Sequence, residues 1–248
     1  DIRAVSGLQM VNLIWRHLAT RPEVLAWAWS GVRPLIGSQE MIGARQRLIH
    51  AVELPVIAEV SKQVWAAAGV DAKQIPEVRS MVGDYIRGNG TNMIALTALR
   101  LRLAGVNDVA AALTPAPLPP PAAPLPPLPK IDALEPQLAA GVRSLAQRHE
   151  GAQGGIIPSL YLELVRWPQL INTLPSWLAS LYAPAALRAA RDSAIRAAEA
   201  EALAMLPNLG APPPAAQEVR PALEHFTRLV IPDLIPVCIA LNQLLPAS

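Results

Sequence analysis

The chain has 248 residues, of which 52% are hydrophobic, 4% aromatic and 16% charged, and its net charge is +2. This weak charge, with no basic run and few aromatic side chains, argues against nucleic-acid binding. The single cysteine, Cys238, excludes an internal disulfide and a cysteine-based zinc site. Because one cysteine suits a reducing compartment and no signal peptide is visible, we expect a cytoplasmic protein.

The first part of the chain predicts helices, because apolar residues recur at helical spacing and β-branched residues are sparse. Pro22 is typical of a first helical turn, Ser38 of an N-cap, and Gly31 and Pro34 of a bend. Between two of these helices, the polar sequence GNGTN at 88–92 predicts a tight turn. The predicted helices cover residues 7–20, 22–36, 39–54, 55–68, 71–87 and 93–103.

Residues 114–130 interrupt the helices with a segment that contains nine prolines. Proline fixes φ and donates no backbone hydrogen bond, so we expect an extended polyproline II strut that rises ~3.1 Å per residue. The strut separates two parts of similar length, residues 1–113 and 131–248. It is either a stiff link between similar modules or a flexible spacer between unrelated ones. A third reading makes it a ligand for an aromatic groove on a partner.

The second part of the chain also predicts helices, and no stretch alternates between apolar and polar residues as a strand would. Residues 167–187 carry no charge but include three prolines and several polar residues. We therefore expect buried helices here and no membrane span. The fold class predicted for the whole chain is all-α. The helices cover 131–149, 156–166, 168–182, 184–205, 218–230 and 234–245, with loops at 151–155 and 206–215.

The two parts of the chain can be matched at a nearly constant offset. Residues 18–25 match 164–171 at a shift of 146, and residues 94–96 match 239–241 at a shift of 145. Two matches at nearly the same shift, so far apart, favour an internal duplication. We predict two pseudo-twofold helical repeats that pack as one unit, with the functional site in a cleft between them.

Few residues suggest a particular chemistry. The four histidines are scattered and no His, Asp or Glu spacing is typical of a metal site, so we expect neither a metal nor a cofactor. The segment 88–92 has two readings. It is either a simple turn, or a place where Asn89, Asn92 and free backbone N–H groups at a helix start receive a carboxylate or halide.

Several features occur together in an order that resembles one family. They are the two all-α halves, the proline-rich link, the sequence LAT-x-P at 18–22, the pair Gly-Asn at 88–89 before an apolar helix, and PS-x-x-x-x-L-x-x-WP at 158–168. Together they resemble the group I 2-haloacid dehalogenases, which act on both enantiomers. The resemblance implies hydrolysis of a carbon–halogen bond next to a carboxylate, by a water that an Asp activates, with inversion and no covalent ester. It also implies a homodimer.

The residues that carry this chemistry match the family only in part. Asn89 matches the asparagine of the Gly-Asn turn, and Ser159 matches the serine of the second half. The catalytic Asp should follow that serine, where this chain has Leu160. The aromatic residues of the family's pocket correspond to Met10 and Leu13, which are aliphatic.

A substitute base would have to come from another carboxylate. Glu163 lies three residues after Leu160 and shares its helix face, although an ion pair with Arg166 on the surface is the simpler reading. Asp84, the other candidate, lies five residues before Asn89, roughly one and a half helical turns away from it.

Two functions therefore remain open. As a hydrolase of small 2-halocarboxylic acids, the protein would use Glu163 as base, Asn89 and Asn92 to position substrate or halide, and Ser159 to hold the carboxylate or water. As a binding protein, the same pocket would hold a small apolar carboxylic acid without hydrolysing it. A weaker third idea is a scaffold whose strut binds a partner.

Overall fold

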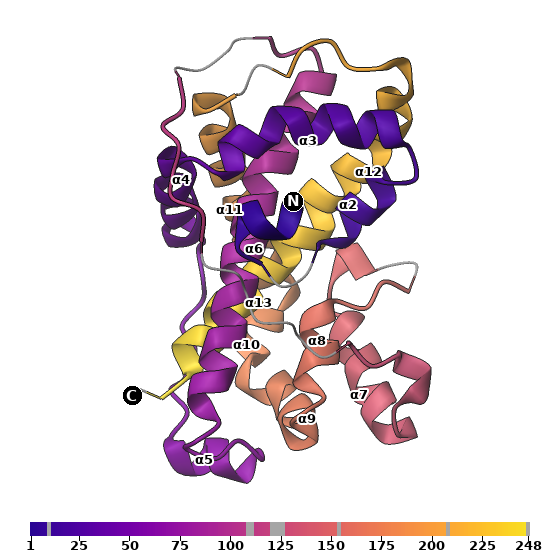
Figure 1. Cartoon of the computed structure of the whole chain (residues 1–248). Helices are drawn as coiled ribbons and strands as arrows, with labels where there is room; N and C mark the ends of the chain where they lie inside the picture. The colour runs from indigo at the N-terminus through magenta and orange to yellow at the C-terminus, as the bar shows by residue number, and fades with distance from the viewer. Residues whose placement is uncertain (9–10, 108–111, 120–126, 153–154, 207–208, 247–248) are drawn as a thin grey trace.

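The computed structural model describes residues 1–8, 11–107, 112–119, 127–152, 155–206 and 209–246 (Figure 1). Within these ranges the chain is all-α, as the sequence predicts, and one isolated bridge joins Ser38 to Pro115. The helices before the linker are α1 (Ile2–Ser6), α2 (Leu13–Leu18), α3 (Pro22–Ile36), α4 (Gln39–Ala51), α5 (Lys62–Ala67) and α6 (Ile75–Leu103).

The helices after the linker include several short turns. They are η1 (Ile131–Ala133), α7 (Pro136–Ala146), η2 (Glu150–Ala152), α8 (Ser159–Leu164), α9 (Pro168–Trp177), α10 (Ala179–Tyr182), α11 (Pro184–Ala204), η3 (Pro214–Val219), α12 (Arg220–His225), η4 (Phe226–Val230) and α13 (Ile231–Leu244). The turns η1, η2 and η3 are 3₁₀-helical, whereas η4 is π-helical.

The predicted turn at 88–92 is wrong, because these residues lie inside the long helix α6 and are all buried. Gly costs about 1 kcal/mol relative to Ala in a helix, but packing can override that preference. A Cβ on Gly88 would lie 3.0 Å from Leu8 Cδ1, and one on Gly90 would lie 2.9 Å from Arg45 Cγ. The glycines therefore let neighbouring segments approach α6 closely, which is a tertiary reason for their presence.

Several other predicted boundaries also differ from the structure, and the helix expected over 131–149 is divided into η1 and α7. Of the helix expected over 7–20, residues 7, 8, 11 and 12 are not helical; α2 begins at Leu13, where Asn12 caps its start by accepting a hydrogen bond from Ile14 N at 3.2 Å. Residues 52–61 are not helical, so the helix expected over 55–68 is only α5. The break expected at 231–233 is absent, since η4 continues directly into α13.

Other start signals in the sequence are confirmed. Ser38 Oγ accepts from Met41 N at 3.1 Å and caps α4. Prolines stand in the first turns of α3, α9 and α11, where their missing N–H needs no partner. Helix α3 continues through Gly31 and Pro34 to Ile36.

The start of the proline-rich linker is attached to the N-terminus of α4. Gln39 N donates to Thr114 O at 2.9 Å, and Ala116 N donates to Gly37 O at 2.8 Å. Thr114 N also donates to the Glu40 carboxylate at 3.0 Å. Residues 120–126 of the predicted strut lie outside the described residues.

The hydrophobic core combines helices from both sides of the linker. Helix α6 packs along α13 through the middle of the molecule, and α11 contacts both of them (Figure 1). By length and composition the helical run Pro214–Leu244 could cross a membrane, yet 72% of its most apolar window is buried in the fold. Such burial is typical of a core helix.

A buried carboxylate fixes the segment that leads into α8. Asp233 is fully buried, and its Oδ2 accepts from Gly151 N at 3.0 Å while its Oδ1 faces Arg191 Nη1 at 3.3 Å. A Cβ on Gly151 would lie 2.6 Å from Val230 Cα, so only glycine fits against η4 here. The position of η2 is thereby tied to the start of α13.

Candidate functional site

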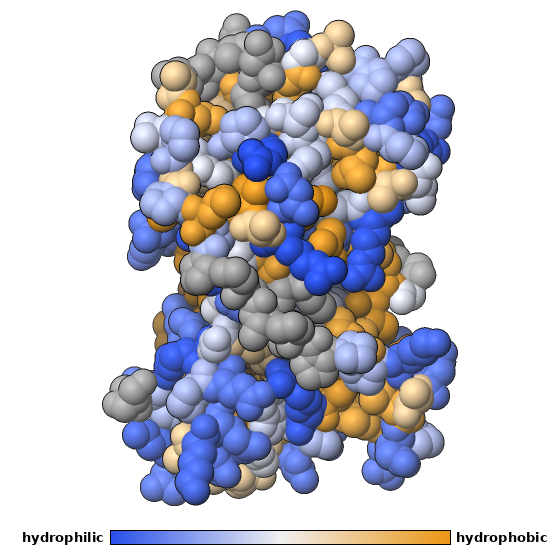
Figure 2. Space-filling model, in the orientation of Figure 1, coloured by the Kyte–Doolittle hydropathy of each residue, from blue (hydrophilic) through white to orange (hydrophobic). Residues whose placement is uncertain are grey.

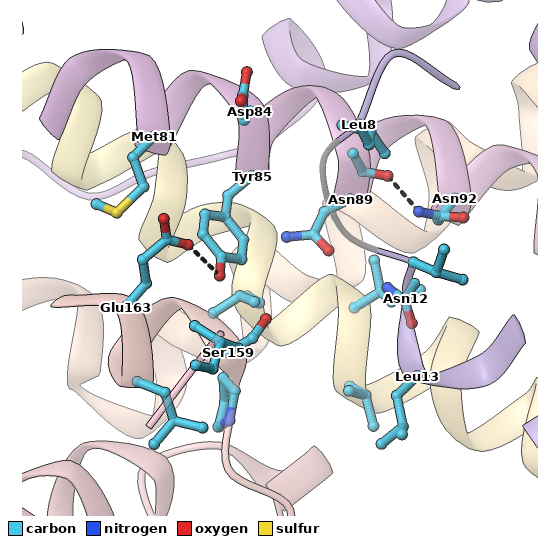
Figure 3. Close-up of a pocket in the computed structure, with 18 of the residues that line it drawn as sticks. Leu8, Asn12, Leu13, Met81, Asp84, Tyr85, Asn89, Asn92, Ser159 and Glu163 are labelled. Atoms are coloured by element: carbon cyan, nitrogen blue, oxygen red, sulfur yellow. Dashed lines mark hydrogen bonds between the residues drawn. The ribbon is translucent and has the colours of Figure 1, made fainter. Parts of the chain in front are cut away.

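One cavity of about 420 Å³ opens between α2, α6, α8 and the η4–α13 segment. Its polar lining comes mainly from α6 and α8, whereas η4 and α13 contribute apolar side chains. Figure 3 shows the polar groups that face one another across it. The lining residues used below are Leu13, Arg16, Glu77, Asp84, Tyr85, Asn89, Asn92, Ser159, Glu163, Arg166, Phe226, Val230, Ile231 and Leu234.

The structure brings most of the sequence-predicted site residues together. Asn89, Asn92, Ser159, Glu163 and Leu13 all line this cavity. Leu160, by contrast, is fully buried in the hydrophobic core and is not among the lining residues. Met10 lies outside the described residues.

Glu163 is held in the cavity wall by two neighbours. Its side chain is 6% exposed, Tyr85 Oη donates to Glu163 Oε2 at 3.0 Å, and Arg166 Nη2 lies 3.2 Å from Glu163 Oε1. The ion pair expected with Arg166 therefore exists, but the carboxylate is buried rather than on the surface. Burial raises the pKa of Glu163 above its ordinary value, although the Tyr85 hydrogen bond and the Arg166 charge oppose this.

Tyr85 is a site residue that sequence reasoning missed. It stands four residues before Asn89, so both side chains leave the same face of α6. Burial, followed by the charge of Glu163, raises the pKa of Tyr85 well above its ordinary value, whereas the Ser159 hydroxyl partly offsets this. The phenol therefore stays protonated and serves as a hydrogen-bond donor.

Asn89 directs its amide into the cavity, toward the side occupied by Tyr85 (Figure 3). Its buried Nδ2 has no hydrogen-bond partner with normal geometry in the described part of the chain. A nearby group is the Cys238 thiol. Burial raises the pKa of Cys238 to about 12, although hydrogen bonding by the Asn89 amide acts to lower it. A neutral thiol is a weak acceptor, so Asn89 keeps an amide proton for a ligand.

Asn92 lines the same cavity, but both ends of its side chain already have partners. Its Oδ1 accepts from Trp15 Nε1 at 2.8 Å, and its Nδ2 donates to Gly88 O at 2.8 Å. Asn92 thus connects α2 to α6 and fixes the orientation of the cavity wall.

Charged residues surround the opening of the cavity. Asp84 forms an ion pair with Arg87, whose Nη2 lies 2.9 Å from Asp84 Oδ1. Arg166 Nη1 lies 2.5 Å from Glu77 Oε1. Arg16 also lines the cavity, is exposed, and forms no ion pair with any residue that the structure describes. The opening therefore carries a cation that is free to attract an anion.

No group of three or more His, Cys, Asp or Glu side chains within the described ranges could hold a metal ion. The cavity instead combines a buried carboxylate, amide and hydroxyl donors, and a large apolar wall. Such a site suits a ligand with one anionic end and one apolar end.

Only the comparison with solved structures bears on the fold. No family model matches the sequence, and no curated protein matches it. A solved structure of D-2-haloacid dehalogenase with L-LA is similar at 20% identity and a TM-score of 0.82, over 99% of this chain and 90% of that one. Two structures of a D-2-haloacid dehalogenase mutant, one of them a complex with D-2-CPA, match at 18% identity and a TM-score of 0.80, with the same coverage. The chain therefore has the all-α scaffold of these dehalogenases.

Proposed function

We propose that this protein hydrolyses the carbon–halogen bond of 2-halocarboxylic acids, with Glu163 as the base that activates water. The observation that carries the proposal is the Glu163 carboxylate, which is buried in the wall of the cavity on a dehalogenase scaffold. A raised pKa makes a carboxylate a stronger base, and burial supplies that shift here.

The reaction needs one water and no covalent intermediate. Glu163 accepts a proton from the water while the water oxygen bonds to carbon 2 of the substrate. The carbon–halogen bond breaks, the electron pair leaves with the halide, and a 2-hydroxy acid of inverted configuration results. Tyr85 and Arg166 each engage one carboxylate oxygen, but a carboxylate has about four lone-pair sites. Glu163 can therefore still accept a hydrogen bond from the water.

Other residues of the site would bind and orient the substrate. The Asn89 amide and the Ser159 hydroxyl offer donors to the carboxylate, whereas Tyr85 keeps Glu163 in place. Arg16 at the opening favours the entry of anions, because an unpaired cation raises their local concentration. Each of these roles is a binding or positioning role; only Glu163 exchanges a proton.

One observation favours a second function, binding without hydrolysis. Leu160 occupies the position at which the resemblance implies the catalytic Asp, and Arg166 already pairs with Glu163. An ion-paired carboxylate is a weaker base than a free one. In this alternative the cavity holds a small apolar carboxylic acid and releases it unchanged.

Halide release from racemic 2-chloropropionate separates the two functions. We expect release by the unmodified protein, loss of release in Glu163→Gln, and unchanged release in Glu218→Gln, whose exposed carboxylate pairs with Arg21 on the surface. The rate should rise with pH as Glu163 loses its proton, with a midpoint above the ordinary Glu pKa. Equal release by Glu163→Gln would exclude Glu163 as the base. Binding of 2-chloropropionate without any release would establish the second function instead.

A further inference from the structure

The cavity is larger than a three-carbon haloacid requires. Its volume is about 420 Å³, and a water-sized group takes up ~30 Å³ in a liquid, so about 14 such groups would fill it. The few non-hydrogen atoms of 2-chloropropionate would leave most of this space empty. Apolar space that a ligand leaves unfilled contributes nothing to binding.

The additional space lies along an apolar stripe. Phe226, Val230, Ile231 and Leu234 line the cavity from η4 and α13, at a spacing that keeps them on one helical face. From the first to the last of these residues an α-helix would rise ~12 Å, which is an upper value here because η4 is π-helical. A staggered alkyl chain advances roughly 1.25 Å per C–C bond, so about nine or ten bonds would match the stripe.

One end of the stripe is next to the polar groups. Leu234 and Asn89 line the same cavity, and Leu234 lies one helical turn before Cys238, whose thiol is next to the Asn89 amide. A ligand whose carboxylate binds Asn89 therefore has its carbon 2 near Leu234, and its alkyl chain is directed along the stripe toward Phe226.

The opening of the cavity also presents apolar surface. Leu13 is 50% exposed although it lines the cavity, whereas the next residues of α2, Ile14 and Trp15, are buried. Figure 2 shows apolar side chains gathered on the right side of the waist of the molecule, between the regions in which Figure 1 places α7 and α8. A large apolar side chain at a pocket mouth gains most when a ligand covers it.

We infer that the preferred ligands are 2-substituted alkanoic acids with chains of up to about ten carbons, the length that the stripe and the cavity volume both allow. This inference rests on the proposed function for the orientation of the carboxylate. The alkyl chain follows η4 and α13, and its far end covers Leu13.

Calorimetric titration with unhalogenated acids tests the chain length without any need for hydrolysis. From butanoate to octanoate, each added methylene should raise the affinity roughly three- to fourfold, as expected for a CH₂ that leaves water. Beyond about ten carbons the gain should stop, because the stripe ends. An affinity that does not change with chain length, or no binding of any acid, would overturn the inference.

Two matched variants locate the chain. Leu13→Gln should reduce the gain per methylene for the longest acids, because the tail would meet a polar side chain. Leu203→Gln alters a leucine that is equally exposed, at 51%, but lies on α11 away from the cavity, and should keep the wild-type series. Identical series in both variants would contradict the placement of the chain.

Halide release from 2-bromooctanoate and 2-bromopropionate separates this inference from the proposed function. A chain-length series in binding, with no halide released from either acid, would support the ligand class and reject hydrolysis. Halide release from 2-bromopropionate alone, with no chain-length series, would support hydrolysis and reject the ligand class.

Discussion

Replacing His149 by glutamine should make the fold less sensitive to acid. His149 follows α7 and is buried, with its Nε2 2.6 Å from Tyr161 Oη, and Tyr161 Oη lies 3.1 Å from Tyr182 Oη. Its Nδ1 has no hydrogen-bond partner among the residues that the structure describes. Burial, aided by the charge of Arg148, lowers the pKa of His149 from 6.5 to about 4. The ring therefore stays neutral at physiological pH.

The size and sign of the effect follow from proton linkage. Between pH 6.5 and 4 the unfolded chain binds a proton at this histidine and the folded chain does not, so stability falls as the pH falls. A difference of this size contributes a loss of about 2 kcal/mol at pH 5 and about 3 kcal/mol at pH 4. Glu163 and Asp233 have raised pKa values through burial, and they change stability in the opposite direction over acidic pH.

Urea unfolding at pH 7, 6, 5 and 4 measures this loss for the wild type and for His149→Gln. The difference between the two pH profiles isolates the histidine, because the buried carboxylates contribute equally to both. His50→Gln, at an exposed position on α4, is the control and should follow the wild type. Parallel profiles for the wild type and His149→Gln would refute the argument, whatever their absolute stabilities.

Three further predictions concern packing. Gly151→Ala should lower the free energy of unfolding by about 3 kcal/mol or more, because its Cβ would lie 2.6 Å from Val230 Cα. Gly83→Ala, whose Cβ would meet nothing within 4 Å, should raise the free energy of unfolding by ~0.5–1 kcal/mol. Urea unfolding of both variants measures the two changes. Asn92→Ala should cost ~1–3 kcal/mol in the same assay, because it leaves a buried indole N–H unpaired. Leu160→Asp should lower the melting temperature rather than create activity, because it places a carboxylate at a fully buried position.

The sequence predicts elements correctly where local signals decide. Pro22 and Ser38 mark the starts of α3 and α4, and the polar and apolar spacing of 184–205 matches α11 within one residue. Residues 88–92 show the limit of such signals. Gly and Asn disfavour a helix locally, and nothing in the sequence reveals that Leu8 and Arg45 will pack against those two glycines.

The residues of the candidate site show the same contrast between local sequence signals and tertiary packing. Helical spacing is enough to place Glu163 one turn from Ser159 and next to Arg166, but it does not reveal whether the pair faces water. Glu163 is buried in contact with Tyr85, which donates to its carboxylate from α6, 78 positions earlier in the chain. The spacing of Tyr85 and Asn89 on α6 is the one signal that could have identified this tyrosine.

The pairing of α6 with α13 has a consequence for the covalent continuity of the chain. Each helix comes from a different side of the linker, and Trp65 Nε1 also donates to Leu244 O across the same boundary at 2.8 Å. If the chain were cut within the linker, each of the two fragments would expose the apolar residues that it contributes to the shared core. We therefore expect the two fragments to associate. Neither fragment alone contains both Asn89 and Glu163, so the cavity forms only when the fragments complement each other.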